Sequence, residues 1–563
     1  MKVLKIISKS LFWLFVILLG LFSLAFLCCV YLYRSADYME PQISLSPDKA
    51  VVTDSLRTYK DDWLRRSETG LWEMKLSGGP IERGEAFGKM AGDLLYHQEE
   101  VFVDQLHRYV PDSSYFSFLH KATVIFDRRL GRNVPEEYRK EIKAMSEFCT
   151  HDFDVFGNPY ERQLQYHSAH DIGHAMQDYM LVGCTSFGVW DGASKDSSLL
   201  IGRNFDFYVS DAFAENKIVM FFEPSEGHKF ASVSWPGMIG VLSGMNDAGL
   251  TVCLLASKYE PPHSGTTPVS ILAREILQYA STISEAYEIA ESRKTFVCEN
   301  ILIGSNLDGR AAVIEKTPSH MDLYDVAQEE GLRKDRIVCT NHYQSESFRY
   351  KKANLENLRS SDSGFRFRRV EELLDSLGPA GPSEAAFILR DMKGPRGTDL
   401  GLCNDLSINQ AIAHHSVIFQ PGKLRMYVST SPWQFGKYVC YDLAKVFSDS
   451  LDYHSEIYSD TLAQDSAAFS AGLVGRILKY KAMTARIRAD SAITESFLHE
   501  YEAVNPNYYG TYLNVGDYLL RHGSDPCPSW EKAINLQAKP SESEAIRQKL
   551  SKYKNKHRHG KTS

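Results

Sequence analysis

A cysteine that can act as a nucleophile lies where the chain changes character. The tetrapeptide Gly183-Cys184-Thr185-Ser186 follows a mainly helical stretch and opens a region rich in β-forming residues. The glycine leaves its own carbonyl open to attack by the cysteine sulfur, and the small polar residues that follow do not block the approach. Because a buried structural role is commoner for a lone cysteine, the case for a nucleophile depends on what accompanies it.

Polar residues that can assist a nucleophile recur downstream at the ends of expected strands. Each of them, taken alone, is typical of a turn or of a surface charge. They are Arg203 and Asp206 in the segment 202–207, Asn246 in the turn 244–250, Asn341 in Cys339-Thr340-Asn341-His342, and Arg366 in a helix expected from Ser363. Their order along the chain, rather than any single motif, is what distinguishes them.

In this order the motifs resemble the N-terminal-nucleophile hydrolases of the isopenicillin-N acyltransferase (acyl-coenzyme A:aminopenicillanic acid acyltransferase) and choloylglycine hydrolase type. The resemblance covers roughly residues 80–430, from Gly79-Pro80-Ile81-Glu82-Arg83-Gly84 to the strand 415–419. It implies an α+β fold of four layers, αββα, in which helices enclose two antiparallel sheets. A helical pro-segment would precede this fold, and an all-helical C-terminal region would follow it.

The resemblance also implies that the chain cleaves itself between Gly183 and Cys184. The new α-amine of Cys184, with an ordinary pKa of about 8, would then take the thiol proton, so that base and nucleophile share one residue. By this analogy Asp206 would hold the ammonium group and Arg203 would steady the thiolate.

The analogy also covers the other three candidate residues. Asn341 would donate a hydrogen bond to the oxyanion as the substrate carbonyl becomes tetrahedral. Asn246 matches a family turn, and Arg366 matches the arginine of the late helix.

Two departures from the family narrow the expected function. This chain carries 183 residues before Cys184, and Ala256-Ser257 stand where bile-salt hydrolases place an asparagine that assists the oxyanion. The acyltransferase or amidase branch is therefore favoured over bile-acid specificity.

We expect an amidase or acyltransferase that acts on an N-acyl amide or a related lipid-like acyl substrate through an S-acyl enzyme on Cys184, with no metal or organic cofactor. Coenzyme-A thioesters are scarce outside the cytoplasm, which favours hydrolysis.

Two other classes of function compete with this hypothesis. His167, His170 and His174 share a helix face with Asp171 beside them, which suggests a metal-dependent hydrolase, but no general-base glutamate lies between the histidines. Packing near the cleavage site is the favoured role for these histidines. A non-catalytic, membrane-tethered scaffold whose helical tail binds a protein partner is the third class, and it predicts an uncut chain.

The pattern of the chain predicts five segments. They are a membrane anchor (1–34), a stalk and mainly helical pro-segment (35–183, helical from Trp72), the catalytic domain (184–449), a helical region resembling tetratricopeptide hairpins (450–550) and a basic disordered tail (551–563). Within the catalytic domain we expect helices over 268–293 and 364–393 and strands at 301–304, 311–315, 321–324, 413–419 and 424–428.

The uncharged run from Leu11 to Tyr33 is long enough to cross a bilayer as a helix. Lysines precede it at positions 2, 5 and 9, so the N-terminus should face the cytoplasm and the catalytic part should be extracytoplasmic, on the periplasmic or extracellular side. Because the run is longer than a signal-peptide core and has no evident small-residue cleavage site, an uncleaved anchor is favoured.

Composition excludes several other classes. The net charge of -8 is mild and the basic residues are scattered, so a nucleic-acid partner is not expected. Of ten cysteines, two lie in the apolar run, and removing Cys184 leaves seven spread over a long chain. A disulfide framework is therefore not expected.

Overall fold

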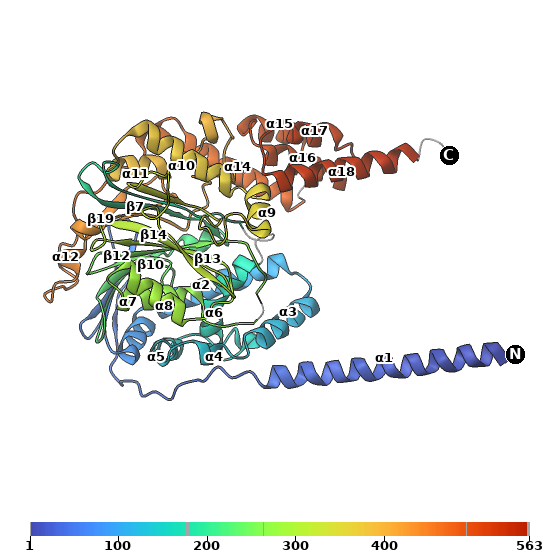
Figure 1. The fold of residues 1–563 in the computed structure, drawn as a ribbon, viewed down its shortest axis with the longest axis horizontal. Helices are drawn as coiled ribbons and strands as arrows, with labels where there is room; N and C mark the ends of the chain where they lie inside the picture. Colours follow the sequence, from blue (N-terminus) through green and yellow to red (C-terminus); the bar gives the residue numbers. More distant parts are fainter. Residues whose placement is uncertain (1, 176–180, 263, 491, 560–563) are drawn as a thin grey trace.

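Two β-sheets lie face to face between two layers of helices (Figure 1). The computed structural model describes residues 2–175, 181–262, 264–490 and 492–559. Helices α7 (Val269–Tyr279) and α8 (Ile283–Ser292) cover one sheet, and α10 (Ser363–Leu377) and α11 (Pro382–Leu389) cover the other. The predicted four-layer α+β fold is confirmed.

The larger sheet has eleven strands in the described part of the chain. In spatial order they are β1 (Val51–Val52), β2 (Leu56–Tyr59), β3 (Asp62–Arg66), β4 (Trp72–Gly78), β9 (Ile218–Pro224), β10 (Phe230–Ser234), β11 (Ser243–Asn246), β12 (Leu250–Ala256), β13 (Glu299–Ser305), β14 (Arg310–Lys316) and β15 (Met321–Tyr324). Their pairing is antiparallel except between β4 and β9, which run parallel. Strands β12 and β13 are buried along their whole length, as expected for the centre of a covered sheet.

The smaller sheet holds the region around Cys184. Its order is β16 (Arg336–Cys339), β6 (Thr185–Asp191), β7 (Ser197–Phe205), β17 (His415–Gln420), β18 (Arg425–Ser429) and β19 (Tyr438–Asp442), and a separate small sheet pairs β5 (Leu181–Val182) with β8 (Phe207–Tyr208). Cys184 directly precedes β6, where Thr185 pairs with Asn204 and Ser186 with Arg203. This register brings Cys184 to the end of β7, beside Arg203.

The pro-segment differs from its prediction, because its first part is sheet rather than stalk and helix. Strands β2, β3 and β4 lie between residues 56 and 78, and β4 pairs with β9 of the catalytic domain. The apolar residues Trp72, Met74 and Leu76 occupy every second position, which is the period of a strand, and the charged residues between them are buried as well. The helices begin only at Pro80: α2 (Pro80–Tyr109), α3 (Ser113–Phe126), α4 (Leu130–Asn133), α5 (Glu136–Ser146) and α6 (Pro159–Ala175).

The motif from Gly79 to Gly84 serves packing in this structure. A Cβ on Gly84 would lie 2.1 Å from the carbonyl oxygen of Glu141, so α2 and α5 approach each other at backbone distance there. Arg83 is fully buried and pairs with Glu141, which also accepts a hydrogen bond from Arg274 of α7 at 3.2 Å. The region before Cys184 is therefore joined to the later part of the chain through a buried ionic cluster as well as through β4.

The C-terminal region is helical, as predicted, but it begins later and ends later. Residues 450–465 return along β19, where Tyr441 bridges to Tyr458 and Tyr438 to Leu462. The helices in and around this region are α9 (Lys352–Ser360), α12 (Leu443–Val446), α13 (Ser466–Ser470), α14 (Leu473–Arg488), α15 (Glu495–Val504), α16 (Tyr509–Arg521), α17 (Cys527–Ile534) and α18 (Pro540–His559). The basic tail, predicted to be disordered from residue 551, instead continues α18 to His559. Lys549 pairs with Asp517 and Lys554 with Glu531, which holds this helix against its neighbours.

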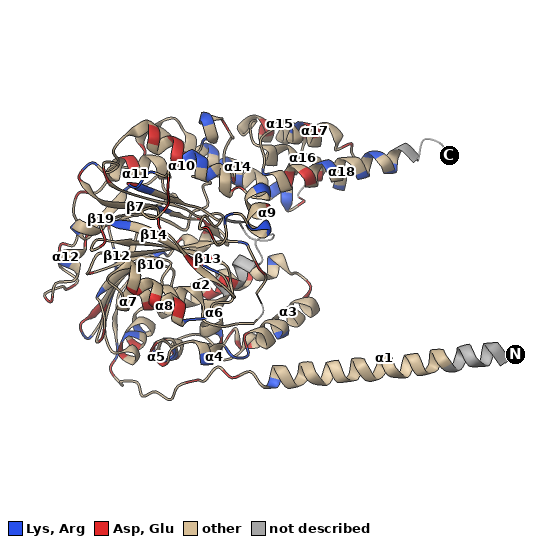
Figure 2. Cartoon of the chain, in the orientation of Figure 1, with Lys and Arg blue, Asp and Glu red and all other residues tan. Residues whose placement is uncertain are grey.

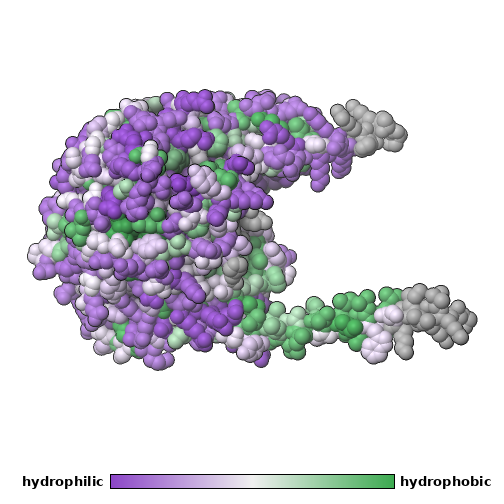
Figure 3. Space-filling model, in the orientation of Figure 1, coloured by the Kyte–Doolittle hydropathy of each residue, from purple (hydrophilic) through white to green (hydrophobic). Residues whose placement is uncertain are grey.

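Helix α1 (Lys2–Arg34) extends away from the body of the molecule (Figure 1). Its segment Ser10–Arg34 has a mean hydropathy of 2.7 and is not buried by the protein. Residues 10–33 of this helix carry no charge, and Figure 2 shows this part in tan, while Figure 3 shows its apolar surface. By length and composition this helix can cross a membrane, and a signal sequence near an N-terminus has the same properties.

Candidate active site

Cys184 is fully buried and lies beside a buried arginine. The Nη2 of Arg203 is 3.7 Å from the Cys184 Sγ, and the same guanidinium donates to the carbonyl oxygens of Leu242, at 3.1 Å, and Leu254. Burial raises the pKa of the Cys184 thiol to about 11, the Arg203 charge opposes this rise and the Asp206 charge adds to it. In the uncut chain the thiol is therefore protonated at neutral pH.

Asp206 is a buried carboxyl beside the predicted cleavage site. It follows β7 directly, has no exposed surface, and its main-chain carbonyl accepts a hydrogen bond of 3.1 Å from the Gly183 amide. Neither Oδ1 nor Oδ2 is hydrogen bonded within the residues that the structure describes. Burial raises the pKa of Asp206 to about 8, although Arg366 and Arg203 oppose the shift. Burying a carboxylate that has no hydrogen-bond partner destabilises the folded chain, and a nearby cation would stabilise the carboxylate.

Arg366 links the nucleophile to the other predicted residues. Its guanidinium donates to the main-chain oxygen of Cys184, to Thr185 Oγ1 at 3.0 Å, to Asn341 Oδ1 at 2.6 Å and to Asp362 Oδ1 at 2.9 Å. The side chain is fully buried. Arg366 therefore fixes the start of β6 relative to Asn341.

Asn341 follows β16 and is held by hydrogen bonds on both its backbone and its side chain. Its Nδ2 donates to the Ala256 carbonyl at 2.6 Å, and its main-chain amide donates to Ser363 Oγ at 2.8 Å. A side-chain amide has two N–H groups, and the contact with Ala256 uses one of them. Its role as an oxyanion donor stays a prediction.

Asn246 lies away from this group and has a structural environment. Its Oδ1 accepts from the Leu250 amide at 2.8 Å, and its Nδ2 donates to the carbonyls of Leu277 and Ala280 at 2.9 and 2.8 Å. These bonds attach the β11–β12 turn to the C-terminal end of α7. The structure therefore brings Cys184, Arg203, Asp206, Asn341 and Arg366 together and leaves Asn246 outside.

One residue that sequence reasoning missed contacts the predicted cleavage site. Gln410 Nε2 donates to the Gly183 carbonyl oxygen at 3.4 Å, and Gln410 is 3% exposed. It lies in an irregular segment between α11 and β17, which has no periodic pattern and none of the family motifs. No signal in the sequence indicated it.

A second missed feature is an aromatic cluster next to Arg203 and Asp206. Its rings, spaced 5.1–6.5 Å apart where they meet, belong to Phe205, Phe207, Phe213, Trp235 and His414. The cation of Arg203 lies 4.8 Å from the Phe205 ring centre. Lys217, directly before β9, is buried, and burial lowers its pKa to about 8. A buried aromatic cluster therefore lies next to the residues grouped around Cys184.

The histidine group has no metal-binding geometry in its described part. His167 uses both ring nitrogens, with Nδ1 2.8 Å from the Gln163 carbonyl oxygen and Nε2 3.2 Å from the Ile239 amide nitrogen. Asp171 accepts from the Val269 amide at 2.8 Å. The side chains of His170 and His174 lie outside the described residues. Over the described residues the structure has no group of three side chains placed to hold a metal ion.

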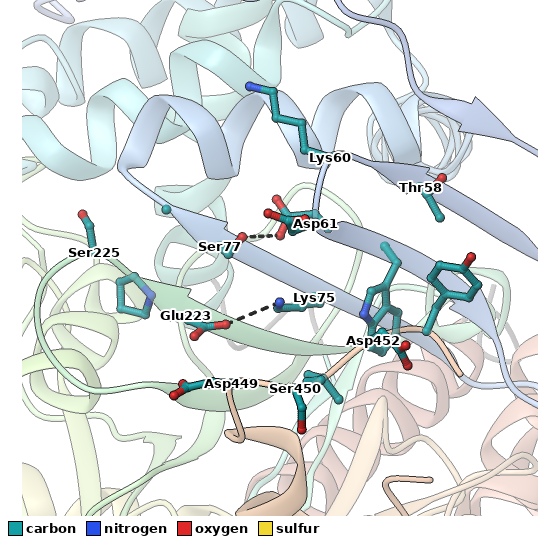
Figure 4. A pocket seen from close by; sticks show the side chains of 16 residues that line it. Thr58, Lys60, Asp61, Lys75, Ser77, Glu223, Ser225, Asp449, Ser450 and Asp452 are labelled. Atoms are coloured by element: carbon teal, nitrogen blue, oxygen red, sulfur yellow. Dashed lines mark hydrogen bonds and ion pairs between the residues drawn. The ribbon is translucent and has the colours of Figure 1, made fainter. Parts of the chain in front are cut away.

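A polar groove of ≈ 830 Å³ lies elsewhere, at the pro-segment strands β2–β4, β9 and residues 449–453 (Figure 4). Inside it Ser77 donates to Asp62 at 2.6 Å, and Lys75 lies 3.5 Å from Glu223. Burial raises the pKa of Asp62 to about 7. Its lining includes none of the residues grouped around Cys184, so it is a separate feature of the surface.

Comparison with known proteins gives a family match for the catalytic region. Residues 192–430 match the family described as acyl-coenzyme A:6-aminopenicillanic acid acyl-transferase. The match confirms, over these residues, the resemblance predicted from the sequence. The matched span contains Arg203, Asp206, Asn341 and Arg366, whereas Cys184 lies before its first residue.

Individual relatives are more distant. The chain is 27% identical over 306 residues to an uncharacterized protein of Archaeoglobus fulgidus (49% of this chain, 50% of that protein) and 26% identical over 283 residues to the protein dcd1A of Dictyostelium discoideum (45% and 60%). It thus spans about half the length of the curated relatives it matches.

Among solved structures, a Caenorhabditis elegans ortholog of N-acylethanolamine-hydrolyzing acid amidase is 18% identical (TM-score 0.30; 42% of this chain, 93% of that one). The penicillin V acylase of Agrobacterium tumefaciens is 14% identical (TM-score 0.32; 48% and 89%).

The raised pKa of Asp206 predicts how the stability of the uncut chain depends on pH. The folded state keeps a proton that the unfolded state releases above about pH 4, so this stabilisation is complete below pH 4 and is lost as the pH rises through 8. In a Cys184→Ala background, Asp206→Asn should therefore raise the free energy of unfolding at pH 8, by up to roughly 1.4 kcal/mol for each unit of the pKa shift.

Denaturant unfolding of the two uncut chains at pH 5 and pH 8 measures this effect. Other buried carboxyls are common to both chains and cancel in the difference. A double variant that is less stable at pH 8 than Cys184→Ala alone would contradict the prediction.

Proposed function

We propose that this chain is an autoproteolytic cysteine N-terminal-nucleophile amidase, anchored by α1 with its catalytic part outside the cytoplasm. The proposal rests above all on Asp206, a fully buried carboxyl with no hydrogen-bond partner among the described residues, next to a buried thiol that follows a glycine. Cleavage after Gly183 would create an α-ammonium group at Cys184. Such a cation would complete the surroundings of Asp206 and remove the cost of burying it unpaired.

The buried thiol supports a precursor that needs processing. With a pKa of about 11 the Cys184 thiol is not a thiolate at neutral pH, and no basic amine exists while Cys184 is part of a peptide bond. After cleavage the α-amine would accept the thiol proton, and Arg203, 3.7 Å from Sγ, would stabilise the thiolate. Cleavage would then supply nucleophile and base in one step.

The catalytic cycle would proceed through an S-acyl enzyme. The thiolate attacks the carbonyl carbon of an N-acyl substrate, the second N–H of Asn341 donates to the oxyanion, and the amine leaves with the proton held by the Cys184 amine. Water then hydrolyses the thioester. The contacts of Arg366 with the Cys184 carbonyl and with Asn341 support this sequence of steps, and none of the steps requires a metal or an organic cofactor.

The aromatic cluster and the anchor favour an amphiphilic substrate. The buried rings of Phe205, Phe207 and Trp235 lie next to Arg203 and make the surroundings of Cys184 apolar. A helix in the membrane would hold the site near lipids with an N-acyl head group. We therefore propose an N-acyl amide, or a related lipid-like ester, as substrate and hydrolysis as the reaction.

The primary test is the covalent state of the purified full chain. We expect two fragments, residues 1–183 and 184–563, with Cys184 as the N-terminus of the second, identified by N-terminal sequencing and intact mass. The structure packs the first fragment into the fold through β4, so the two should stay associated until denatured. A single continuous chain that nonetheless hydrolyses substrate would overturn the proposal, and an uncut, inactive chain would favour the scaffold.

A second test separates hydrolysis from transfer. Cleaved enzyme is incubated with N-lauroyl-glycine, or with lauroyl-coenzyme A plus glycine, and the release of free lauric acid is measured by mass spectrometry. We expect free acid from the amide. Formation of N-lauroyl-glycine alone from the thioester, with no hydrolysis of the amide, would instead make the chain an acyltransferase.

A further inference from the structure

The carbonyl oxygen at the proposed cleavage site has a side-chain donor beside it. Gln410 Nε2 is 3.4 Å from the Gly183 oxygen, and the Gln410 side chain is buried. When the Gly183 carbonyl carbon becomes tetrahedral, its oxygen takes a full negative charge, and hydrogen bonds to a charged acceptor are shorter and stronger than those to a neutral one. The hydrogen bond from Gln410 to the Gly183 oxygen would therefore become stronger during self-cleavage.

The identity of residue 183 provides a second, independent observation. A Cβ on Gly183 would lie 2.7 Å from Gln410 Nε2 and 3.5 Å from Arg366 Nη2. The first distance is closer than a Cβ tolerates, so Gln410 leaves room for a glycine and for no larger residue unless it moves. Gln410 and Gly183 are thus fitted to each other at the bond that would be cut.

The backbone around Gln410 is fixed before any reaction. The Asn409 amide donates to the Asp391 carbonyl at 2.9 Å, Asn409 Oδ1 accepts from the Ala411 amide at 2.9 Å, and Ser407 Oγ donates to the Asn409 carbonyl at 2.9 Å. These bonds hold both neighbours of Gln410. A donor that is held in place before the charge develops contributes most to stabilising an oxyanion.

We propose that Gln410 is the oxyanion donor for self-cleavage, distinct from the residues that serve substrate turnover. This inference rests on the proposed function. In the step concerned, Cys184 Sγ bonds to the Gly183 carbonyl carbon, the bond from that carbon to the Cys184 nitrogen breaks, and the thiol proton ends on that nitrogen. Water then adds to the thioester and yields a Gly183 carboxylate and a free Cys184 thiol.

The two reactions of Cys184 place their oxyanions at different donors. In self-cleavage the oxygen belongs to Gly183 and lies at Gln410. In turnover it belongs to the substrate, and Asn341 is the proposed donor. Gln410 substitutions should therefore slow the appearance of the fragment 184–563 without a matching effect on molecules already cut.

The experiment follows self-cleavage of pulse-labelled full chain in cell-free translation. Gln410→Ala should slow formation of the fragment 184–563 about a hundredfold, as loss of one oxyanion donor does elsewhere. Gln434→Ala is the matched control, because Gln434 is also fully buried and its Nε2 donates to the Leu389 carbonyl at 3.3 Å. It should cleave at the wild-type rate.

Gln410→Glu adds a readout that a purely structural role would not affect. A carboxylate at this position repels the oxyanion, whereas a protonated carboxyl donates to it, so cleavage should be blocked at pH 8 and partly restored at pH 5.

The outcomes separate this inference from the proposed function. If the wild-type chain yields no fragment beginning at Cys184, both are wrong. If the wild type is cut and Gln410→Ala is cut at the same rate, or if Gln410→Glu is equally slow at both pH values, Gln410 is not the donor and the proposed function stands.

Discussion

A chain with alanine at position 184 stays in one piece of 563 residues and turns over no substrate. The sulfur of Cys184 is the attacking atom in both proposed reactions, and a methyl group supplies neither a nucleophile nor, without cleavage, an α-amine. Self-cleavage and substrate turnover both depend on this sulfur. We therefore expect no fragment 184–563 and a fall in turnover of at least about a thousandfold. Intact mass and the release of free acid from N-lauroyl-glycine measure the two effects on the same sample.

Two variants make this result specific to the nucleophile. Cys253→Ala removes another fully buried thiol, from the neighbouring strand β12, and should be cut and active. Cys184→Ser keeps a nucleophilic atom of lower reactivity and should be cut slowly. An alanine chain that is cut after Gly183, or that hydrolyses the amide as fast as wild type, would remove the basis of the proposed mechanism.

The fold of the catalytic domain could be predicted because its strands carry local signals. The strand expected at 321–324 is β15, and the strands expected at 301–304 and 311–315 lie inside β13 and β14. Strand β4 was missed although Trp72, Met74 and Leu76 alternate with the charged Glu73 and Lys75, and the burial of these two charged residues on the second face of the sheet has no local signal. Glu73 is paired with Arg65 of β3, a contact that depends on the folded sheet and not on the local sequence.

The candidate site also combines residues that local motifs reveal with residues that only the packing brings together. Arg203, Asp206, Asn341 and Arg366 belong to ordered motifs, and the structure brings all four to Cys184. Asn246 belongs to a motif as well, but its three hydrogen bonds fix a turn onto α7. Gln410 reaches Gly183 from 227 positions away in the chain, in a segment without regular structure. Such a contact is determined by how the layers pack, so a motif search does not reveal it.

The second large effect is expected from Arg366→Met. Arg366 is buried and donates to four acceptors, among them the Cys184 carbonyl and Asn341 Oδ1, and methionine fills a similar volume with no donor. Asp362, which is partly exposed, would lose its charged partner, and leaving a buried acceptor without its donor costs about 1–3 kcal/mol. We expect the free energy of unfolding to fall by about this amount, and both self-cleavage and turnover to fall about a hundredfold, because Asn341 and Cys184 lose their common anchor.

Arg366→Lys and Arg368→Met separate the role of the guanidinium from that of the helix. Lysine keeps the charge but cannot reach four acceptors from one nitrogen, so it should retain more stability than methionine while cleavage stays slow. Arg368 lies on the same helix, is exposed and contacts the Phe365 ring at 5.0 Å. Its replacement by methionine should change stability by about 0.5 kcal/mol or less and leave cleavage unchanged.

Rates are compared well below the unfolding transition of each variant, where a lost fold cannot account for slow cleavage. If folded Arg366→Met chains cleave at the wild-type rate there, Arg366 stabilises the domain without positioning the nucleophile.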